Sequence, residues 1–162
     1  MSQLATGDKA PDFSLPLDNG RDFHLVAHTG SPVVLFFYPQ DGTPGCNDEN
    51  REFSDLADEF TALGATLVGI SPDTIQSHQK FRARHDLKVP LAADPNRVAI
   101  QAYGLWQLKK LYGREFMGLI RTSFIIAADG TIAAVIKATR IRGHAQKVLD
   151  TLAKHLSEQG AK

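Results

Sequence analysis

Apolar and polar positions along the chain form short blocks that predict strands and helices in alternation. The most apolar block, 33–38, is a run of β-branched and aromatic residues with no polar break, which is typical of a strand buried on both faces. A second such run, 65–70, ends at Ser71-Pro72-Asp73. Shorter apolar runs predict three further strands, at 89–94, 122–127 and 131–137. The last two are separated by Ala128-Asp129-Gly130, a strong hairpin signal.

Apolar residues at helical spacing lie between and after these strands. Thr43 and Pro44 suit the N-cap and first position of a helix whose apolar positions continue to Gly64, a residue that favours a helix end. Further helices are predicted at about 74–85, 95–103 and 145–156. The segment 7–25 contains prolines and the turn Asp18-Asn19-Gly20, so it predicts a short hairpin or edge element.

The order of these elements predicts the fold class. Strands that alternate with helices and end in a hairpin and a final helix predict an α/β sandwich with parallel and antiparallel neighbours in its sheet. No repeat, linker or low-complexity segment divides the 162 residues, so residues 1–162 are expected to form a single domain. The chain has no phosphate-binding loop motif and no dinucleotide-binding glycine motif, so no nucleotide cofactor is expected.

Composition and charge exclude several other classes. Lys plus Arg and Asp plus Glu both number 18, so the zero net charge gives no reason to expect nucleic acid or an anionic membrane as a partner. The N-terminus lacks the apolar core of a signal peptide, and no apolar run approaches the ~20 residues of a membrane span. A single cysteine rules out an internal disulfide and a cysteine-rich zinc site. We therefore expect a soluble protein of a reducing compartment, the cytoplasm.

Several polar groups have ordinary structural interpretations. His24 and His28 are four residues apart but have no third ligand nearby, so no metal site is expected. His78 lies on the inner side of its predicted helix and is interpreted as a core or interface histidine. Residues 101–121 mix aromatic and basic side chains; at zero net charge, a loop that lines a pocket or forms a docking surface is preferred to a single-stranded nucleic-acid platform. We interpret the last basic cluster as a solvated face, with a docking patch as the alternative. Its members are Lys137, Arg140, Arg142 and Lys147.

The candidate nucleophile is Cys46, the only cysteine. It lies just after the run 33–38 and in the first turn of the predicted helix. There the helix macrodipole and the backbone N–H groups that lack helical acceptors favour a thiolate. A lone intracellular cysteine more often acts as a small buried hydrophobe, but the strand–turn–helix placement favours a reactive thiol.

The segment Pro39-x-x-x-Thr43-x-x-Cys46 resembles the active-site signature of the peroxiredoxins. The fuller pattern Phe37-Tyr38-Pro39 … Thr43-Pro44-Gly45-Cys46 … Glu49 is similar to the bacterioferritin-comigratory (BCP/PrxQ) branch of that family. Later motifs are similar to the same branch in order and spacing: Tyr103-Gly104-Leu105-Trp106, Tyr112-Gly113-Arg114, Phe116-Met117-Gly118 and Arg121-x-Ser123-Phe124-Ile125-Ile126. The resemblance runs from about Gly7 to His155 and implies a thioredoxin-like fold, with a mixed central sheet flanked by helices and an N-terminal extension.

The resemblance also implies a function: a thiol-dependent peroxidase for hydrogen peroxide and organic hydroperoxides, with no cofactor and no metal. Cys46 would be the peroxidatic nucleophile, Thr43 would orient the peroxide, and Arg121 would stabilise the thiolate and the transition state. Pro39 would shield the sulfur. From the residues alone, Thr43 could simply cap the helix and Arg121 could pair with a surface carboxylate. Supporting roles are expected for Tyr38, Gly45, Glu49 and Trp106, with Glu49 orienting Arg121 or nearby backbone and Trp106 lining the pocket.

The chain departs from the branch pattern at the second cysteine. Members often carry a resolving cysteine five residues after the first, where this chain has Arg51, or in the next helix, near Arg82. Asn47, where Thr is usual, is expected to be a minor change. The Cys46 sulfenic acid would then be resolved by an external thiol, from thioredoxin, glutaredoxin or glutathione, or by a second Cys46 in a linked dimer of an otherwise monomeric protein. The alternative is a peroxide sensor or adaptor that passes oxidation to a partner protein through a mixed disulfide.

Overall fold

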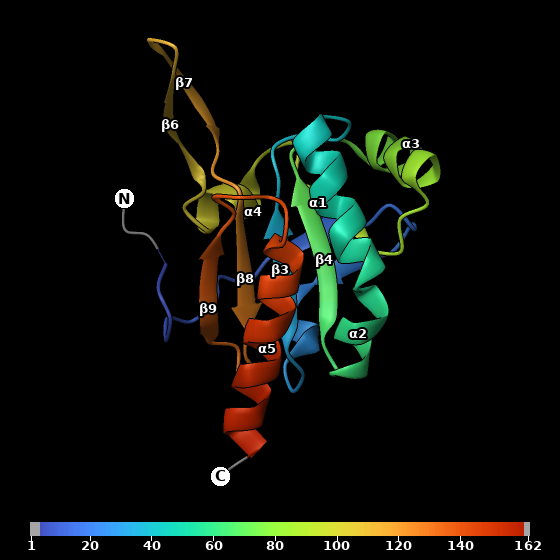
Figure 1. Ribbon diagram of the computed structural model, residues 1–162, viewed down its shortest axis with the longest axis vertical. Helices are drawn as coiled ribbons and strands as arrows, with labels where there is room; N and C mark the ends of the chain where they lie inside the picture. The colour runs from blue at the N-terminus through green and yellow to red at the C-terminus, as the bar shows by residue number, and fades with distance from the viewer. Residues whose placement is uncertain (1–3, 161–162) are drawn as a thin grey trace.

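A mixed sheet of five strands forms the centre of the molecule. The computed structural model describes residues 4–160. In spatial order the strands are β5 (Leu91–Ala93), β4 (Thr66–Ser71), β3 (Val33–Phe37), β8 (Thr122–Ile126) and β9 (Ile132–Lys137). β4 runs parallel to β3 and β5, whereas β8 runs antiparallel to β3 and β9 (Figure 1). The predicted α/β sandwich with a mixed sheet is confirmed.

The central strand β3 separates two layers of the hydrophobic core. All of its residues are buried. Because successive side chains of a strand point to opposite faces, Val33, Leu35 and Phe37 join one hydrophobic cluster. Val34 and Phe36 join the other. This burial on both faces is what the unbroken apolar run predicts.

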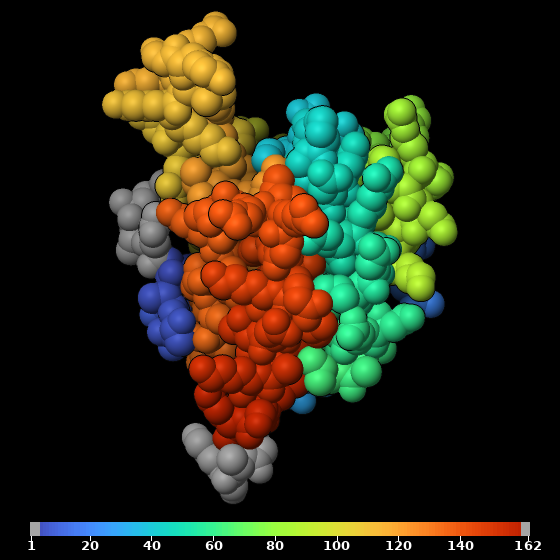
Figure 2. All heavy atoms as spheres, in the orientation of Figure 1, coloured from blue at the N-terminus to red at the C-terminus, as the bar shows by residue number. Residues whose placement is uncertain are grey.

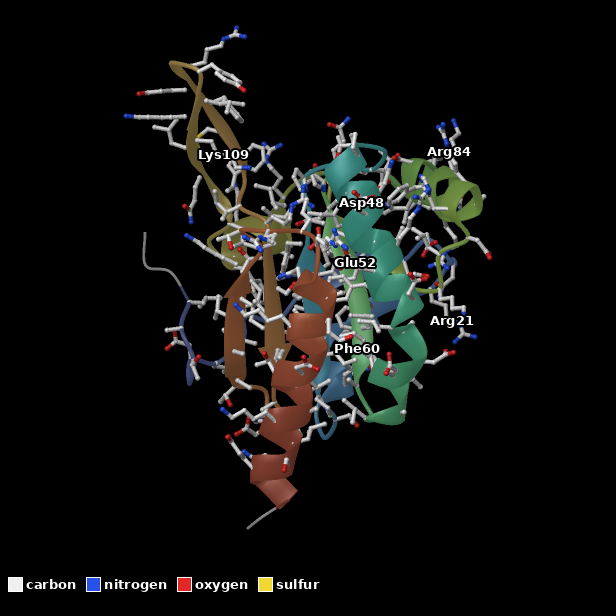
Figure 3. The ribbon with its side chains drawn as sticks, viewed as in Figure 1. Arg21, Asp48, Glu52, Phe60, Arg84 and Lys109 are labelled. Carbon is white, nitrogen blue, oxygen red and sulfur yellow. The ribbon has the colours of Figure 1, made fainter. Side chains whose placement is uncertain are left out.

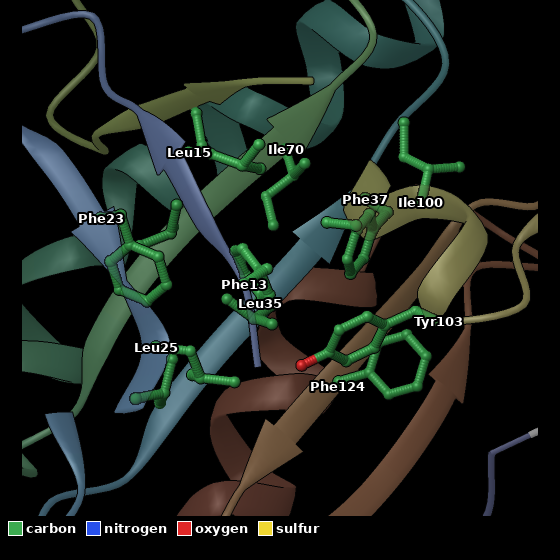
Figure 4. Close-up of a cluster of buried hydrophobic side chains, with 14 of the residues drawn as sticks. Phe13, Leu15, Phe23, Leu25, Leu35, Phe37, Ile70, Ile100, Tyr103 and Phe124 are labelled. Carbon is green, nitrogen blue, oxygen red and sulfur yellow. The ribbon is translucent and has the colours of Figure 1, made fainter. Parts of the chain in front are cut away.

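The N-terminal segment packs on one face of the sheet. β1 (Ser14–Pro16) pairs antiparallel with β2 (Asp22–His24), and a short 3₁₀ helix, η1 (Leu25–His28), follows. These elements and α4 (Val98–Ala102) bury an aromatic cluster that includes Phe13, Phe23, Tyr103 and Phe124 (Figure 4). The predicted N-terminal hairpin is confirmed.

Two predicted elements are shorter in the structure. The strand expected at 89–94 is β5, which begins only after Pro90, a residue with no N–H for a sheet hydrogen bond. The helix expected at 95–103 is α4, which begins after Arg97 in a left-handed conformation (φ 58°). Asp94 compensates for this late start, because its carboxylate accepts hydrogen bonds from the backbone N–H of Val98 and of Ile100.

Helices α1 (Pro44–Asp55), α2 (Ala57–Ala62) and α5 (His144–Gly160) cover the other face, with α3 (Ile75–His85) beside α1 (Figure 1). The prediction of one helix as far as Gly64 is wrong, because the helix is interrupted at Leu56 (φ −98°, ψ 2°). The N–H of Leu56 donates to both Glu52 O and Phe53 O, at 3.2 Å each. Such a tightened last turn ends α1 and redirects the chain into α2.

The C-terminal end of α2 agrees with the prediction of a helix end at Gly64. Gly64 has φ +81° and follows Leu63, the C-cap residue of α2. Its N–H donates to Thr61 O at 2.9 Å, and the N–H of Ala65 donates to Phe60 O at 3.1 Å. This is the Schellman pattern, which requires a left-handed residue where only glycine is free of strain.

Residues 106–119 form a β-hairpin, whereas the sequence predicted a loop over 101–121. β6 (Trp106–Leu111) pairs antiparallel with β7 (Arg114–Leu119), and the hairpin projects from the body of the molecule (Figures 1 and 2). Tyr112 and Gly113 form the tip, with φ values of 52° and 75°, as a two-residue hairpin turn requires. Most of the hairpin is exposed on both faces, so no buried face imposes a clear alternation on its sequence.

Within residues 4–160, no helix combines the length and the apolar character needed to cross a membrane.

Candidate active site

The thiol of Cys46 lies where strand β3 leads into helix α1. Pro44 is the first residue of α1, so Cys46 is its third. The first helical hydrogen bond runs from the N–H of Asn47 to Thr43 O, at 2.8 Å. The N–H groups that precede it, including that of Cys46, have no helical acceptors and create a positive end that attracts an anion. Cys46 itself is completely buried.

Arg121 connects this thiol to a buried carboxylate. Its Nη2 donates to Cys46 Sγ at 3.3 Å and its Nη1 donates to Glu49 Oε1 at 2.5 Å. Sheet register brings the two segments together, because β8 is antiparallel to β3 and pairs Thr122 with Phe37, at the end of β3 that leads to Cys46. Burial disfavours the charge on Arg121, but the negative charges of Glu49 and Cys46 outweigh it and raise the pKa of Arg121.

Glu49 is a buried carboxylate with an incomplete set of hydrogen bonds. Its side chain is 1% exposed. Among the described residues, its Oε2 has no hydrogen-bond partner and lies 4.0 Å from His144 Nε2. Burial raises the pKa of Glu49 to about 7, although Arg121 opposes the shift. The carboxyl group beneath Arg121 can therefore gain or lose a proton near neutral pH.

His144 completes this arrangement and was not identified from the sequence. It is the first residue of α5, it is buried, and its Nε2 hydrogen-bonds to Ser123 Oγ at 2.8 Å. Burial lowers the pKa of His144 to about 4, and the charges of Lys147 and Arg121 add to the shift. A signal was present in the sequence: His144, Val148 and Leu152 follow one another at intervals of four, so His144 lies on the buried stripe of its helix.

A second buried carboxylate, Asp41, holds the loop that precedes Cys46. It accepts hydrogen bonds from Tyr38 Oη (2.6 Å), Ser77 Oγ (2.8 Å) and His78 Nδ1 (2.7 Å). The other ring nitrogen of His78 bonds to Ala92 O at 3.0 Å. Burial raises the pKa of Tyr38 well above its ordinary value, and Asp41 adds to the shift. His78 is thus the core histidine that the sequence predicted, and Tyr38 supports the loop.

The ligand-type atoms of Asp41, Asp73 and His78 lie within 4.8 Å of one another. Protein groups already use them, since Asp73 Oδ2 accepts from Ser71 Oγ at 2.6 Å and from the N–H of Asp41 at 2.7 Å. We therefore interpret the cluster as a hydrogen-bond network. The other candidate pair is separated, because His24 contacts Asp12 whereas His28 stacks on Phe23.

Thr43, Gly45 and Pro39 surround the thiol turn in different ways. Thr43 occupies the predicted N-cap, but the expected capping hydrogen bond is absent, and its Oγ1 instead faces Gln40 O at 3.4 Å. At Gly45, an added Cβ would lie 2.7 Å from Ile141 Cδ1 and 3.6 Å from Arg121 Nη2. Gly45 therefore lets residue 141 close over the turn. Pro39 lies half-buried in the loop between β3 and α1.

Trp106 contacts the N-terminal part of the molecule. It begins β6, packs against the N-terminal core cluster, and has the guanidinium of Arg97 over its ring at 4.5 Å. Arginines with structural contacts occupy the two positions where a resolving cysteine was expected. Arg51 Nη2 contacts His85 Nδ1 at 2.9 Å and links α1 to α3. Arg82 pairs with the buried carboxylate of Asp18 and links α3 to the N-terminal segment.

The fold and the site define a class of protein: a thioredoxin-like protein with a buried thiol held against a guanidinium. The sequence matches the AhpC/TSA family model over residues 6–135, and the chain belongs to this family.

Several similar proteins within the family are Bcp or PrxQ peroxiredoxins. The Bcp protein of Helicobacter pylori is 43% identical over 152 residues, which cover 94% of this chain and 100% of that protein. Peroxiredoxin Bcp of Bacillus subtilis is 37% identical over 156 residues, with 96% and 99% covered. The solved structure of the bacterioferritin comigratory protein of Xanthomonas campestris matches with a TM-score of 0.86 at 32% identity, covering 93% of this chain and 99% of that one.

These similarities confirm the predicted peroxiredoxin resemblance and the thioredoxin-like fold. The chain is a peroxiredoxin, an antioxidant oxidoreductase that acts on peroxides with thiol reductants. One difference stands out. Structures of peroxiredoxin Q from Xanthomonas campestris carry serine in place of two different cysteines, so that protein has at least two. This chain has one.

Proposed function

We propose that this peroxiredoxin works by a one-cysteine mechanism, in which Cys46 reduces the hydroperoxide and an external thiol regenerates it. The observation that carries the proposal is the Arg121 guanidinium, which contacts both Cys46 Sγ and Glu49. A cation at this distance would stabilise the thiolate and could also stabilise the negative charge that develops on the departing oxygen. Arg121 would therefore stabilise both the attacking thiolate and the departing oxygen.

The oxidation step transfers one oxygen atom to sulfur. The Cys46 thiolate attacks the terminal peroxide oxygen, the S–O bond forms as the O–O bond breaks, and the departing alkoxide or hydroxide takes up a proton to leave as alcohol or water. The product is the Cys46 sulfenic acid. Thr43 would orient the peroxide, and Pro39 would limit access of water to the sulfur. Organic hydroperoxides are included because the Xanthomonas campestris relative is described as reducing alkyl peroxides.

Regeneration requires a second thiol, and this chain contains no other cysteine. An external thiol, from thioredoxin, glutaredoxin or glutathione, would form a mixed disulfide with Cys46 and a second thiol would release it. We propose that the chain acts as a single-domain monomer in a reducing compartment, the cytoplasm, where such thiols are abundant. A linked dimer through two Cys46 residues is the competing route, which non-reducing electrophoresis of the oxidised protein would reveal.

A sensor or adaptor is the second candidate function, favoured by the same lack of a resolving cysteine. Its sulfenic acid would persist until one specific partner protein reacts with it. A sensor oxidises once per encounter, whereas an enzyme turns over steadily with a general thiol system.

The test is rapid mixing of the reduced protein with hydrogen peroxide, followed by a sulfenate trap and intact mass. We expect fast second-order addition of one oxygen atom, its loss in Cys46→Ser, and addition of two and three oxygen atoms as peroxide is raised. Steady peroxide consumption with thioredoxin, glutaredoxin or glutathione would support the enzyme. Oxidation no faster than that of a free thiol would reject the one-cysteine peroxidase.

A further inference from the structure

Beside Arg121 there is an open cavity of about 270 Å³. Its lining comes from three segments: Lys109 on β6, Ile120 and Arg121 before β8, and the chain that leaves β9, namely Lys137, Ala138 and Thr139. Half of the lining residues are cationic and none is acidic. The cavity shares Arg121 with the thiol site, and the guanidinium of Arg121 lies 3.3 Å from the buried sulfur.

The cations that line the cavity differ in how they are paired. Arg121 is paired with Glu49. No ion pair joins Lys109 or Lys137 to a carboxylate among the described residues, whereas the next residue along β6, Lys110, pairs with Glu115 at 3.6 Å. Neighbouring side chains of a strand point to opposite faces. The hairpin therefore presents one lysine to a carboxylate and the other to the cavity.

Lys109 is held at the cavity by close packing. Its Cδ lies 3.1 Å from the position that a Cβ on Gly118 would take, so its stem crosses the backbone of the partner strand. Burial and the nearby charge of Arg121 lower the pKa of Lys109, whereas the negative charge of Cys46 opposes the shift. Lys109 thus lies within electrostatic reach of both the guanidinium and the sulfur. Figure 3 labels Lys109 on the hairpin and Asp48 on α1 at the same end of the molecule.

We propose that this cavity binds the regenerating thiol and selects a small thiol that carries carboxylates, with Lys109 and Lys137 as the carboxylate-binding residues. The inference rests on the proposed one-cysteine function. Its physical reason is the charge of the attacking species: a thiolate is anionic, so cations at the cavity attract it and favour its ionised form. A hydroperoxide, in contrast, carries no charge on its reacting oxygen atoms.

Regeneration of Cys46 needs no reductant other than this thiol. The thiolate sulfur attacks Cys46 Sγ, an S–S bond forms as the S–O bond of the sulfenic acid breaks, and the hydroxide that leaves takes the proton of the thiol to become water. A second molecule of the thiol then attacks the mixed disulfide, which releases reduced Cys46 and the disulfide of the small thiol.

The test compares glutathione, which has two carboxylates, with its diethyl ester, which has none and keeps the same thiol. Sulfenic acid is first formed with one equivalent of hydrogen peroxide, and its loss is followed by intact mass. We expect glutathione to react at least about tenfold faster than the ester at low salt, with the preference falling as ionic strength rises. In Lys109→Gln/Lys137→Gln the ratio should fall to about one. Lys110→Gln, on the opposite face of β6, is the matched control and should keep the wild-type ratio.

Three outcomes would overturn the proposal: equal rates for glutathione and its ester, a preference that survives in Lys109→Gln/Lys137→Gln, or an equal loss in Lys110→Gln. A charge preference seen only in the oxidation step, with a carboxylate-bearing hydroperoxide, would assign the cavity to the oxidant and also overturn it. Binding of unreactive S-methylglutathione to the reduced protein, measured by calorimetry, decides the same question without peroxide. Failure of Cys46 to oxidise would reject the proposed function, whereas loss of this binding alone would reject only the cavity.

Discussion

Two buried carboxylates lie on either side of the Cys46 turn, and they are built differently. The Asp41 side chain is 5% exposed and accepts hydrogen bonds from three side chains, those of Tyr38, Ser77 and His78. Glu49 is 1% exposed and has one side-chain donor, Arg121, while its second oxygen has no partner among the described residues. Burial is nearly equal, so hydrogen bonding makes the difference.

The difference in hydrogen bonding suggests different roles for the two carboxylates, one in fixing the local structure and the other in modulating a neighbouring charge. A buried carboxylate with several donors has its hydrogen bonds satisfied and fixes the segments that supply them. Asp41 in this way connects the loop before Cys46 to helix α3. A buried carboxylate with a missing donor is costly to ionise, and its one partner here also contacts the thiol. We infer that Asp41 positions the thiol turn, whereas Glu49 adjusts the cation that acts on the sulfur.

The largest effect should come from removing the charge of each carboxylate with its isosteric amide. At pH 8, Asp41→Asn leaves donors that face an amide N–H and should lower the free energy of unfolding by about 3–5 kcal/mol. Glu49→Gln keeps an acceptor for Arg121 and removes a charge that is costly to bury, so its loss should be about 1 kcal/mol or less. Urea denaturation followed by Trp106 fluorescence measures both. The exposed Asp48→Asn is the control, and equal losses for the two buried sites would remove the distinction.

The next expected effect is on the rate of oxidation, and it tests only the contacts that Arg121 makes with Cys46 and Glu49. Arg121→Ala removes the donor to Cys46 Sγ, and we expect the rate constant for oxidation by hydrogen peroxide to fall about 10²–10³-fold. Arg121→Lys keeps a charge but lacks the fork that reaches both Sγ and Glu49, so it should fall between wild type and Arg121→Ala. Stopped-flow mixing measures all three. A wild-type rate in Arg121→Ala would remove Arg121 from the reaction.

The sequence predicts the Cys46 turn well because its signals are local. A fully apolar strand followed by Thr43-Pro44 places the cysteine in a first helical turn, and the structure has it there. Helix and strand periodicity also predict which face of an element is buried. They do not predict which distant residue meets a buried polar group. The pairing of Arg121 with Glu49 depends on the register of β8 against β3, and only the family resemblance pointed to it before the structure.

The wrong predictions have related physical causes. The hairpin of β6 and β7 was missed because most of its residues are exposed on both faces, so the apolar pattern carries no period of two. The break at Leu56 was missed because Leu56 is a good helix former, and nothing local in the sequence marks a helix end there. Its partly buried side chain packs against the core cluster. His144 and the Asp41 cluster are buried polar groups, whose partners come from segments far apart in the chain.

A pH series should separate the titration of Glu49 from that of its histidine neighbour, His144. Because burial raises the pKa of Glu49 from 4.5 to about 7, Glu49 contributes stability that is lost as pH rises through this window. Burial lowers the pKa of His144 from 6.5 to about 4, so His144 contributes stability that is lost as pH falls through that window. In the wild type the two trends oppose each other.

The variants should therefore diverge from wild type in opposite directions. The free energy of unfolding of Glu49→Gln relative to wild type should rise by up to ~3 kcal/mol between pH 4.5 and 7. That of His144→Gln should fall by a similar ~3 kcal/mol between pH 4 and 6.5. Urea denaturation at half-unit pH steps measures both differences. Curves parallel to wild type would mean that neither group titrates in the folded protein.

The smallest expected effect comes from substituting two glycines of the turn, one near each of the two buried carboxylates. Gly42 has φ +86° and open space around it, whereas Gly45 is helical and a Cβ there would meet Ile141 Cδ1 at 2.7 Å. Gly45→Ala should cost about 1 kcal/mol of stability through this contact, against a gain in helix propensity. Ile141→Val removes Cδ1, so a double-mutant cycle should recover about 1 kcal/mol of coupling with Gly45→Ala. Gly42→Ala costs stability through backbone strain, which Ile141→Val cannot relieve. No coupling between Gly45→Ala and Ile141→Val would mean that residue 141 does not press on the turn at Gly45. Equal coupling with Gly42→Ala would mean that the coupling does not arise from this contact.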